Sequence, residues 1–319
     1  MNFRTPISIA KTAHPIDYNS KIISIGSCFA ENMAQKFDYL KFQNTTNPFG
    51  IIFNPVSIEK IIRRVVEQHF FTEQDIFLHN DLWHCYEIHS ELSNSNKEEL
   101  LQSLNQIITE THDYLIHSTH IIITYGTSWI YRNIQSEQIV ANCHKVPQKQ
   151  FTKELLAAGE IENSIQNTVQ LIQELNPDIN FIFTVSPVRH IKDGFVENQL
   201  SKAHLFTAIH QVLKNHNLQF PNFTYFPSYE IMMDELRDYR FYAEDMLHPN
   251  QIAIDYIWKL FIDSNIAVES SSVMQEVEEI QKGLNHRSFN PESEQHLKFL
   301  SKLHQKIEIL KSKFPQFKF

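Results

Sequence analysis

Two short motifs near opposite ends of the chain carry the residue types that could do chemistry. Residues 26–30 read Gly-Ser-Cys-Phe-Ala, which sets a hydroxyl beside a thiol, and residues 245–248 read Asp-Met-Leu-His. A thiol or hydroxyl can attack an acyl carbonyl when an imidazole takes its proton and a carboxylate orients that imidazole. The motifs therefore predict acyl transfer or ester hydrolysis, with Cys28 or Ser27 as nucleophile and His248 as base.

The first motif lies where a strand is expected to give way to a helix. The apolar run 21–25 (KIISI) stops at a glycine, and apolar residues recur at helical spacing from Phe29 onward. A thiol at a helix N-terminus feels the positive end of the helix dipole, which lowers its pKa and favours the thiolate. Cys28 is therefore the favoured nucleophile. Ser27 either caps the helix or is itself the nucleophile. A packing role for Cys28 is the alternative.

Apolar strands and amphipathic helices alternate along the chain. Further strands are expected at 120–125, 181–185 and 223–226, and residues 81–92 could form a strand or an ordered loop. Helices are expected over 57–69, 97–117, 160–175, 198–215, 229–240 and 249–262, the last with Pro249 at its first position. Continuous apolar strands separated by helices are typical of a parallel sheet covered on both faces. The sequence therefore predicts an α/β fold.

Polar motifs follow the ends of the expected strands. Residues 126–129 read Gly-Thr-Ser-Trp and residues 186–190 read Ser-Pro-Val-Arg-His, while the Asp245 motif follows the last strand. Ligands of open parallel sheets bind just beyond the carboxyl ends of the strands, so these motifs predict one site. Arg189 or His190 could bind a substrate carboxylate or phosphate there. A surface ion pair and a hydrogen-bonded histidine are the alternative roles of these two residues.

The first motif resembles the nucleophile turn of the SGNH (GDSL) hydrolase superfamily, and its wording matches the GSCFA family within that group. Matching Gly-Asp-Ser-Leu to residues 26–29 puts Cys28 at the place of the superfamily's serine. The superfamily's last block is Asp-x-x-His followed by a proline and a helix, which Asp245, His248 and Pro249 resemble. The resemblance implies a flavodoxin-like three-layer α/β/α domain over residues 1–265, with a mainly parallel, SGNH-hydrolase-like sheet.

The resemblance also implies an oxyanion hole, made of the nucleophile's N–H, a glycine from a second block and an asparagine from a third. Gly50 resembles the glycine of the second block. The third block should read Gly-x-Asn but reads Gly126, Thr127, Ser128, so Thr127, Ser128 or the nearby Asn142 would have to replace the asparagine. Losing one such donor typically costs about 10²–10³ in rate. A catalytically silent module that binds a ligand is therefore the second hypothesis.

Bulk composition limits the partners of the protein. Of 319 residues, 42% are hydrophobic and 20% are charged, as in ordinary globular proteins, and the net charge is −9. Nucleic acid and anionic membranes favour basic faces, so both are disfavoured. The chain has only six glycines and no Gly-rich phosphate motif, so no nucleotide cofactor is expected. The expected substrate is a small-molecule or saccharide acyl ester, such as an acetyl ester, or an acyl thioester.

Three cysteines without Cys-x-x-Cys spacing, and no apolar run of signal or membrane-spanning length, predict a cytoplasmic location. Residues 266–319 are charge-rich and are expected to form a helical extension, packed on the α/β domain or on a partner. An apolar stripe along it could serve a homodimer.

Metal binding is considered because the chain has 17 histidines. The clusters are His84, Cys85 and His89, and Cys143 with His144. Neither cluster has a recognised zinc spacing, so no metal is predicted and a metal-dependent hydrolase is the third option.

Overall fold

A computed structural model describes residues 5–217 and 222–319 of the chain. Its centre is a five-stranded sheet in the order β10-β9-β5-β1-β2 in which all neighbouring strands are parallel. The strands are β1 (Lys21–Gly26), β2 (Gln43–Thr46), β5 (His120–Tyr125), β9 (Asn180–Val185) and β10 (Phe223–Phe226). Numbered along the chain, this is the flavodoxin-like order 2-1-3-4-5. The predicted α/β fold is confirmed.

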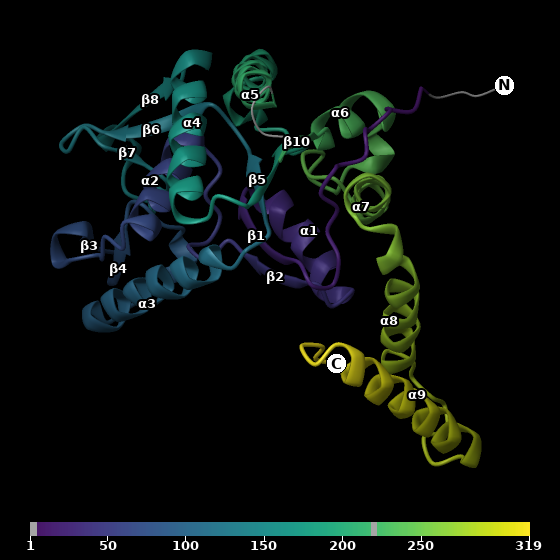
Figure 1. Ribbon diagram of the computed structural model, residues 1–319. Helices are drawn as coiled ribbons and strands as arrows, with labels where there is room; N and C mark the ends of the chain where they lie inside the picture. The colour runs from purple at the N-terminus through teal and green to yellow at the C-terminus, as the bar shows by residue number, and fades with distance from the viewer. Residues whose placement is uncertain (1–4, 218–221) are drawn as a thin grey trace.

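Helices cover both faces of the sheet (Figure 1). On one face lie α2 (Pro55–Val66), α3 (Lys97–Ile116), α4 (Ala158–Leu175) and α5 (Phe195–Asn217), and on the other lie α1 (Cys28–Tyr39) and α7 (Gln251–Asn265). Side chains of a strand alternate between faces. Ile23 and Ile25 of β1 accordingly pack with the first group of helices, and Ile22 packs with the second.

Several strands differ from the prediction. β2 was not expected, because its sequence Gln-Asn-Thr-Thr has no apolar pattern, as an edge strand allows. Residues 81–92 contain both structures considered, strand and ordered loop. The strands outside the main sheet form a hairpin, β3 (Ile76–His79) with β4 (Leu82–Cys85), and an antiparallel sheet of β6 (Trp129–Asn133), β7 (Ile139–Val140) and β8 (Phe151–Leu155).

Two details of the expected helices are wrong. Pro249 is not the first residue of α7, because Asn250 caps that helix and its Oδ1 accepts from the N–H of Ala253 at 3.1 Å. Asparagine is among the most favoured N-cap residues. The helix expected over 229–240 is instead the short α6 (Ser228–Glu230), a π-helical turn (Ile231–Glu235) and a 3₁₀ turn (Tyr239–Phe241).

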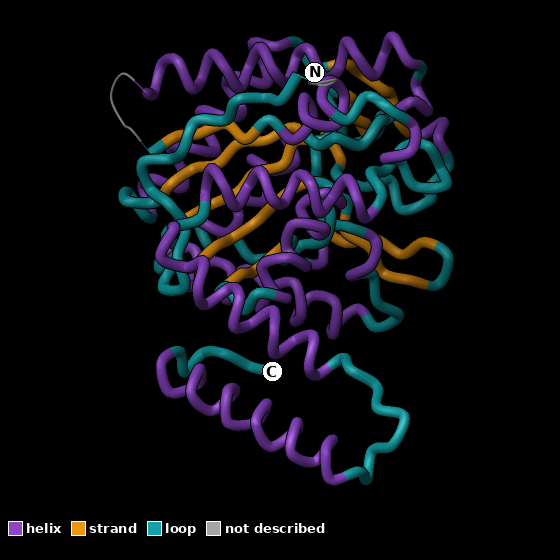
Figure 2. Tube along the Cα trace, turned by 90° about the vertical axis from the view of Figure 1, so that its right-hand side faces the viewer, coloured by secondary structure: helices purple, strands orange, loops and turns teal. Residues whose placement is uncertain are grey.

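The C-terminal segment forms two helices, α8 (Ser271–Leu284) and α9 (Glu294–Lys313), that extend away from the sheet (Figures 1 and 2). The end of the chain turns back onto the α/β part. The rings of Phe314 and Phe317 lie 5.4 and 5.2 Å from the ring of Tyr18. The boundary at residue 265 and a homodimer contact through these helices stay predictions. Within the described residues, no helix is both long and apolar enough to cross a bilayer.

Candidate active site

The turn after β1 requires a glycine. Gly26 has φ +147, and a Cβ atom there would lie 2.2 Å from the carbonyl oxygen of Thr124 in the neighbouring strand β5. The turn is fixed by two bonds, from the Gly26 N–H to Asn47 Oδ1 (2.8 Å) and from the Ser27 N–H to Thr124 O (3.1 Å). The first motif is therefore held against the end of β5, at the point where the strand order reverses and ligands of such sheets bind.

Ser27 and Cys28 have different surroundings in this turn. Ser27 is 2% exposed and is the N-cap of α1, because its Oγ accepts from the Phe29 N–H at 3.3 Å. Cys28 is the first residue of α1 and is partly exposed. Burial raises the pKa of the Cys28 thiol and the charge of Glu31 adds to this, while the N–H groups of Cys28 and Phe29 and the charge of Lys202 act against it. The net direction is opposite to the lowering predicted from the helix N-terminus, because burial outweighs the helix end.

Asp245 and His248 are paired in the loop before α7. His248 Nδ1 lies 2.5 Å from Asp245 Oδ2, and Asp245 Oδ1 accepts from the N–H groups of His248 (3.0 Å) and Leu247 (2.9 Å). These backbone bonds, followed by the contact with the imidazole, lower the pKa of Asp245 to about 2. The carboxylate is therefore ionised at neutral pH, and it orients the ring with Nε2 as the nitrogen left for chemistry.

Arg189 supports the loop that carries this pair. Its N–H donates to Leu247 O at 3.3 Å, its guanidinium donates to Met246 O, and the guanidinium carbon lies 4.3 Å from the centre of the Tyr242 ring. These contacts give Arg189 a structural role in the loop, and its binding of a substrate anion stays a prediction.

His190 lies beside Arg189 and stacks on Phe53, with ring centres 5.7 Å apart. Burial lowers the pKa of His190 to about 3, and the charges of Lys202 and His248 act in the same direction. His190 is therefore neutral near pH 7, and its binding of a substrate carboxylate or phosphate stays a prediction.

Lys202 of α5 lies at the centre of the site and was missed by the sequence prediction. It is 1% exposed, and its Nζ donates to the carbonyl oxygens of Gly126 and Ser186, both at 2.7 Å. It thereby joins the ends of β5 and β9. Burial lowers the pKa of Lys202 to about 7, and the negative charge of Cys28 opposes that shift. A lysine in an amphipathic helix is usually exposed, so the sequence held no signal for this role.

The donors expected in the oxyanion hole are mostly occupied. The Gly50 N–H donates to Asn47 O at 2.7 Å, and the Gly126 N–H donates to Phe53 O at 2.8 Å.

Ser128 and Thr127 both contact Ser201. The N–H of Ser128 donates to Ser201 Oγ and its hydroxyl to Ser201 O, each at 2.7 Å, and the hydroxyl of Thr127 lies 2.8 Å from Ser201 Oγ. The N–H groups of Gly50, Gly126 and Ser128 therefore donate within the protein, and the oxyanion role of Thr127 or Asn142 stays a prediction.

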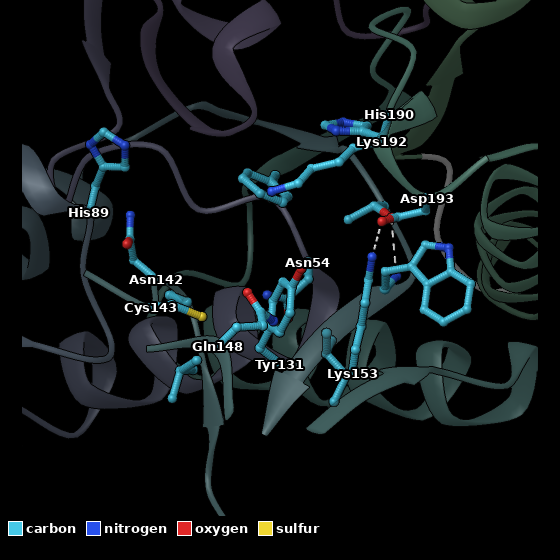
Figure 3. A pocket seen from close by; sticks show the side chains of 16 residues that line it. Asn54, His89, Tyr131, Asn142, Cys143, Gln148, Lys153, His190, Lys192 and Asp193 are labelled. Atoms are coloured by element: carbon cyan, nitrogen blue, oxygen red, sulfur yellow. Dashed lines mark hydrogen bonds and ion pairs between the residues drawn. The ribbon is translucent and has the colours of Figure 1, made fainter. Parts of the chain in front are cut away.

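A cavity of about 380 Å³ borders the site, lined by the segments that follow β5 and β9 and by residues of the β6–β8 sheet (Figure 3). Three of the predicted residues, Thr127, Asn142 and His190, line it, but Cys28 does not. Its other walls carry aromatic and charged side chains, among them Trp129, Tyr131, Lys153, Lys192 and Asp193. The cavity therefore offers a place for a polar ligand beside Thr127 and His190.

The histidine and cysteine clusters are used in hydrogen bonds. His84 Nδ1 lies 2.6 Å from Ser93 Oγ, and His144 Nε2 lies 2.7 Å from the carbonyl oxygen of Cys85. Among the residues that the structure describes, no group of three or more His, Cys, Asp or Glu side chains is placed to hold a metal ion.

Comparison with known proteins decides the family. The model of the GSCFA family matches residues 21–261, and the model of the GSCFA domain protein, C-terminal domain, matches residues 277–319. The chain belongs to the GSCFA family. In this GSCFA protein the first motif, residues 26–30, has the letters of the family name.

No curated protein matches the sequence of this GSCFA protein. A similar solved structure is an acetyl xylan esterase (Est2A) from the rumen bacterium Butyrivibrio proteoclasticus, with 11% identity and a TM-score of 0.40. The match covers 78% of this chain and 64% of that one.

Proposed function

We propose that this GSCFA protein is an esterase or acyltransferase that acts through Cys28, His248 and Asp245. The observation that carries the proposal is the Asp245–His248 pair, in which an ionised carboxylate 2.5 Å from Nδ1 orients the imidazole. The substrate is a small-molecule or saccharide acyl ester, with acetyl as one candidate acyl group, or an acyl thioester. The cavity beside Thr127 and His190 is the proposed place for the alcohol or thiol part of the substrate, to which the acyl group is attached.

The proposed reaction has two steps. His248 takes the proton of the Cys28 thiol, the sulfur forms a bond to the acyl carbon, and the ester oxygen or thioester sulfur leaves with that proton. Water or an acceptor hydroxyl then attacks the acyl-cysteine, His248 takes its proton, and the thiolate leaves. Hydrolysis and transfer differ only in that second nucleophile. The backbone N–H of Cys28 is the proposed oxyanion donor.

Cys28 is proposed over Ser27 because of their positions. The Ser27 hydroxyl is buried and caps α1, and leaving that role to attack a substrate would remove the cap. The thiol of Cys28 is partly exposed at the same helix end.

Substitution of the two candidate nucleophiles tests the proposal. Cys28→Ala should abolish turnover of p-nitrophenyl acetate and labelling by an acyl probe, while Ser27→Ala should keep both. Cys143→Ala is the control for the specificity of the label, since Cys143 is a second partly exposed cysteine. Undiminished turnover in Cys28→Ala would exclude the thiol as the attacking group.

A catalytically silent binding module remains the second candidate function. The observation in its favour is that the N–H groups of Gly50, Gly126 and Ser128 are bonded within the protein, so few donors are left for an oxyanion. A purified protein that binds an ester without turning it over, and whose Cys28 never becomes acylated, would support this alternative.

A further inference from the structure

We propose that Lys202 is the positioning residue that supplies the counter-ion of the Cys28 thiolate, held in place by the ends of two strands of the sheet. The inference rests on the proposed function for its catalytic meaning, but the ion pair itself can be measured without any substrate.

The hydrogen bonds of Lys202 place its charge at the Cys28 turn. Its two acceptors, Gly126 O and Ser186 O, lie just past the ends of β5 and β9. Two residues before Gly126, Thr124 accepts from the Ser27 N–H at 3.1 Å. The ammonium therefore lies at the same edge of the sheet as the first turn of α1.

The bonding of the ammonium is incomplete without another acceptor. A lysine ammonium has three N–H donors, and two of them reach the two carbonyl oxygens. Within the described residues, no carboxylate is in ion-pair or hydrogen-bond contact with Lys202, although its side chain is 1% exposed. A buried cation without a negative partner is strongly disfavoured, so an anion at this place would stabilise it. The thiolate of Cys28 is the anion that the site can form.

The other groups around the pair do not take this role. Glu31, one turn along α1, is negative and raises the pKa of Cys28, and Lys202 lowers it. His190 faces Lys202 from the segment after β9 but is neutral, since its pKa is about 3. The Tyr229 ring lies 5.4 Å from Lys202 Nζ and offers only its face. His248 acts on His190 from the loop before α7.

The arrangement separates two tasks that a cysteine–histidine site usually combines. A cation held at the same edge of the sheet as Cys28 stabilises the thiolate, so the imidazole of His248 does not have to remain protonated for that purpose. His248 can then exchange protons with the leaving group and the acceptor.

Alkylation of Cys28 by iodoacetamide tests the inference on the full chain. The reaction forms a sulfur–carbon bond, releases iodide and proceeds from the thiolate, so its rate against pH reports the pKa of the thiol. Peptide mass spectrometry assigns the label to Cys28. This assignment separates it from Cys85 and Cys143, in which burial raises the thiol pKa to about 12 and about 11.

Neutral and charged replacements of Lys202 should give opposite results. Lys202→Met and Lys202→Gln should slow alkylation at pH 7 by about tenfold or more, which is one pKa unit. The amide N–H groups of the glutamine in Lys202→Gln can still donate hydrogen bonds to the two carbonyl oxygens. Lys202→Arg keeps a charge that cannot be lost near neutral pH. The midpoint of its alkylation profile should therefore lie at the wild-type pH or at a lower pH.

Two variants on α1 complete the test. Glu31→Gln removes a negative charge and should shift the profile to lower pH, opposite to Lys202→Gln. Lys36→Met is the matched control, because Lys36 lies about 12 Å farther along α1 and pairs with Asp255, so its profile should stay unchanged.

The outcome separates this inference from the proposed function. A wild-type profile in folded Lys202→Gln overturns the counter-ion role, even if Cys28→Ala abolishes turnover. A shifted profile supports the ion pair, even if Cys28→Ala leaves turnover intact and the proposed function fails. Should both neutral variants fail to fold by circular dichroism, Lys202→Arg and Glu31→Gln decide, and a profile at higher pH in either contradicts the inference.

Discussion

The thiol half of the candidate site (Cys28, Lys202) and its imidazole half (Asp245, His248) are built in opposite ways. The thiol half is fixed by strand ends, and burial dominates the ionisation of both of its groups. The side chains of the imidazole half are each 44% exposed, and hydrogen bonds within one loop lower the pKa of Asp245. A buried group needs a fixed partner to become charged, whereas an exposed group needs only orientation. We therefore expect substitutions in the two halves to have different effects on turnover, on alkylation of Cys28 and on stability.

The largest effect is expected from Asp245→Asn, which breaks the imidazole half alone. The amide cannot hold the ring in the tautomer that leaves Nε2 able to accept a proton, so kcat should fall by about 10²–10⁴-fold. Asp238→Asn is the control, because Asp238 is an exposed aspartate that pairs with Arg240 in the preceding turn. Alkylation of Cys28 should remain at the wild-type rate in both. A loss of alkylation in Asp245→Asn would show that the two halves are not separate.

Gly26→Ala breaks the thiol half through the backbone. The new Cβ would lie 2.2 Å from Thr124 O at a backbone φ of +147, so the free energy of unfolding should fall by about 3 kcal/mol in urea titrations. Gly159→Ala is its counterpart in α4, where a Cβ meets nothing within 4 Å, and it should raise that free energy by about 0.5 kcal/mol. Equal stabilities of the two variants would contradict the close approach of β1 to β5.

Arg189→Met sharpens the comparison by loosening the imidazole half without touching its two side chains. The loop loses the bond to Met246 O and the stacking on Tyr242, so kcat should fall by about 10-fold to 100-fold. The KM for a neutral ester should stay the same, because Arg189 is not proposed to bind the substrate. Arg240→Met, at an exposed arginine in the same region, is the control. A raised KM for anionic esters alone would restore the anion-binding role first predicted for Arg189.

The smallest effect concerns the pH dependence of the imidazole half. The pKa of Asp245 is lowered from its ordinary value of 3.8 to about 2 in the folded protein. Its contribution to stability is therefore complete above pH 4 and is lost as pH falls through about 2. Carboxyl NMR should give a midpoint near 2, and His248→Ala should leave the pKa below the ordinary value, since the backbone bonds are its main cause. A normal midpoint in the wild-type protein would contradict the backbone hydrogen bonds to Asp245.

The sequence predicted the parts of the fold and site whose signal is local. The runs 120–125 and 181–185 are apolar at nearly every position because β5 and β9 are covered on both faces. The strand β2 escaped prediction because an edge strand can be polar. The motifs at Cys28 and Asp245 could be found because each is contiguous.

Contacts between distant residues account for what the sequence could not predict. Ser128 is bonded to Ser201, 73 residues away, and Lys202 is bonded to Gly126, 76 residues away. Neither pairing leaves a pattern in the sequence around it. The sequence therefore predicted neither the bonding of Ser128 within the protein nor the buried position of Lys202.

The most direct test of the account is to look for an acyl group on Cys28 during turnover. His248→Gln, incubated with p-nitrophenyl acetate and quenched in acid, should accumulate an acetylated Cys28 peptide, because the second step lacks its base. Wild-type protein should show less of it, and Cys28→Ala none. Steady release of p-nitrophenol by the wild-type protein, with no acetyl group ever found on Cys28 in either protein, would contradict the account.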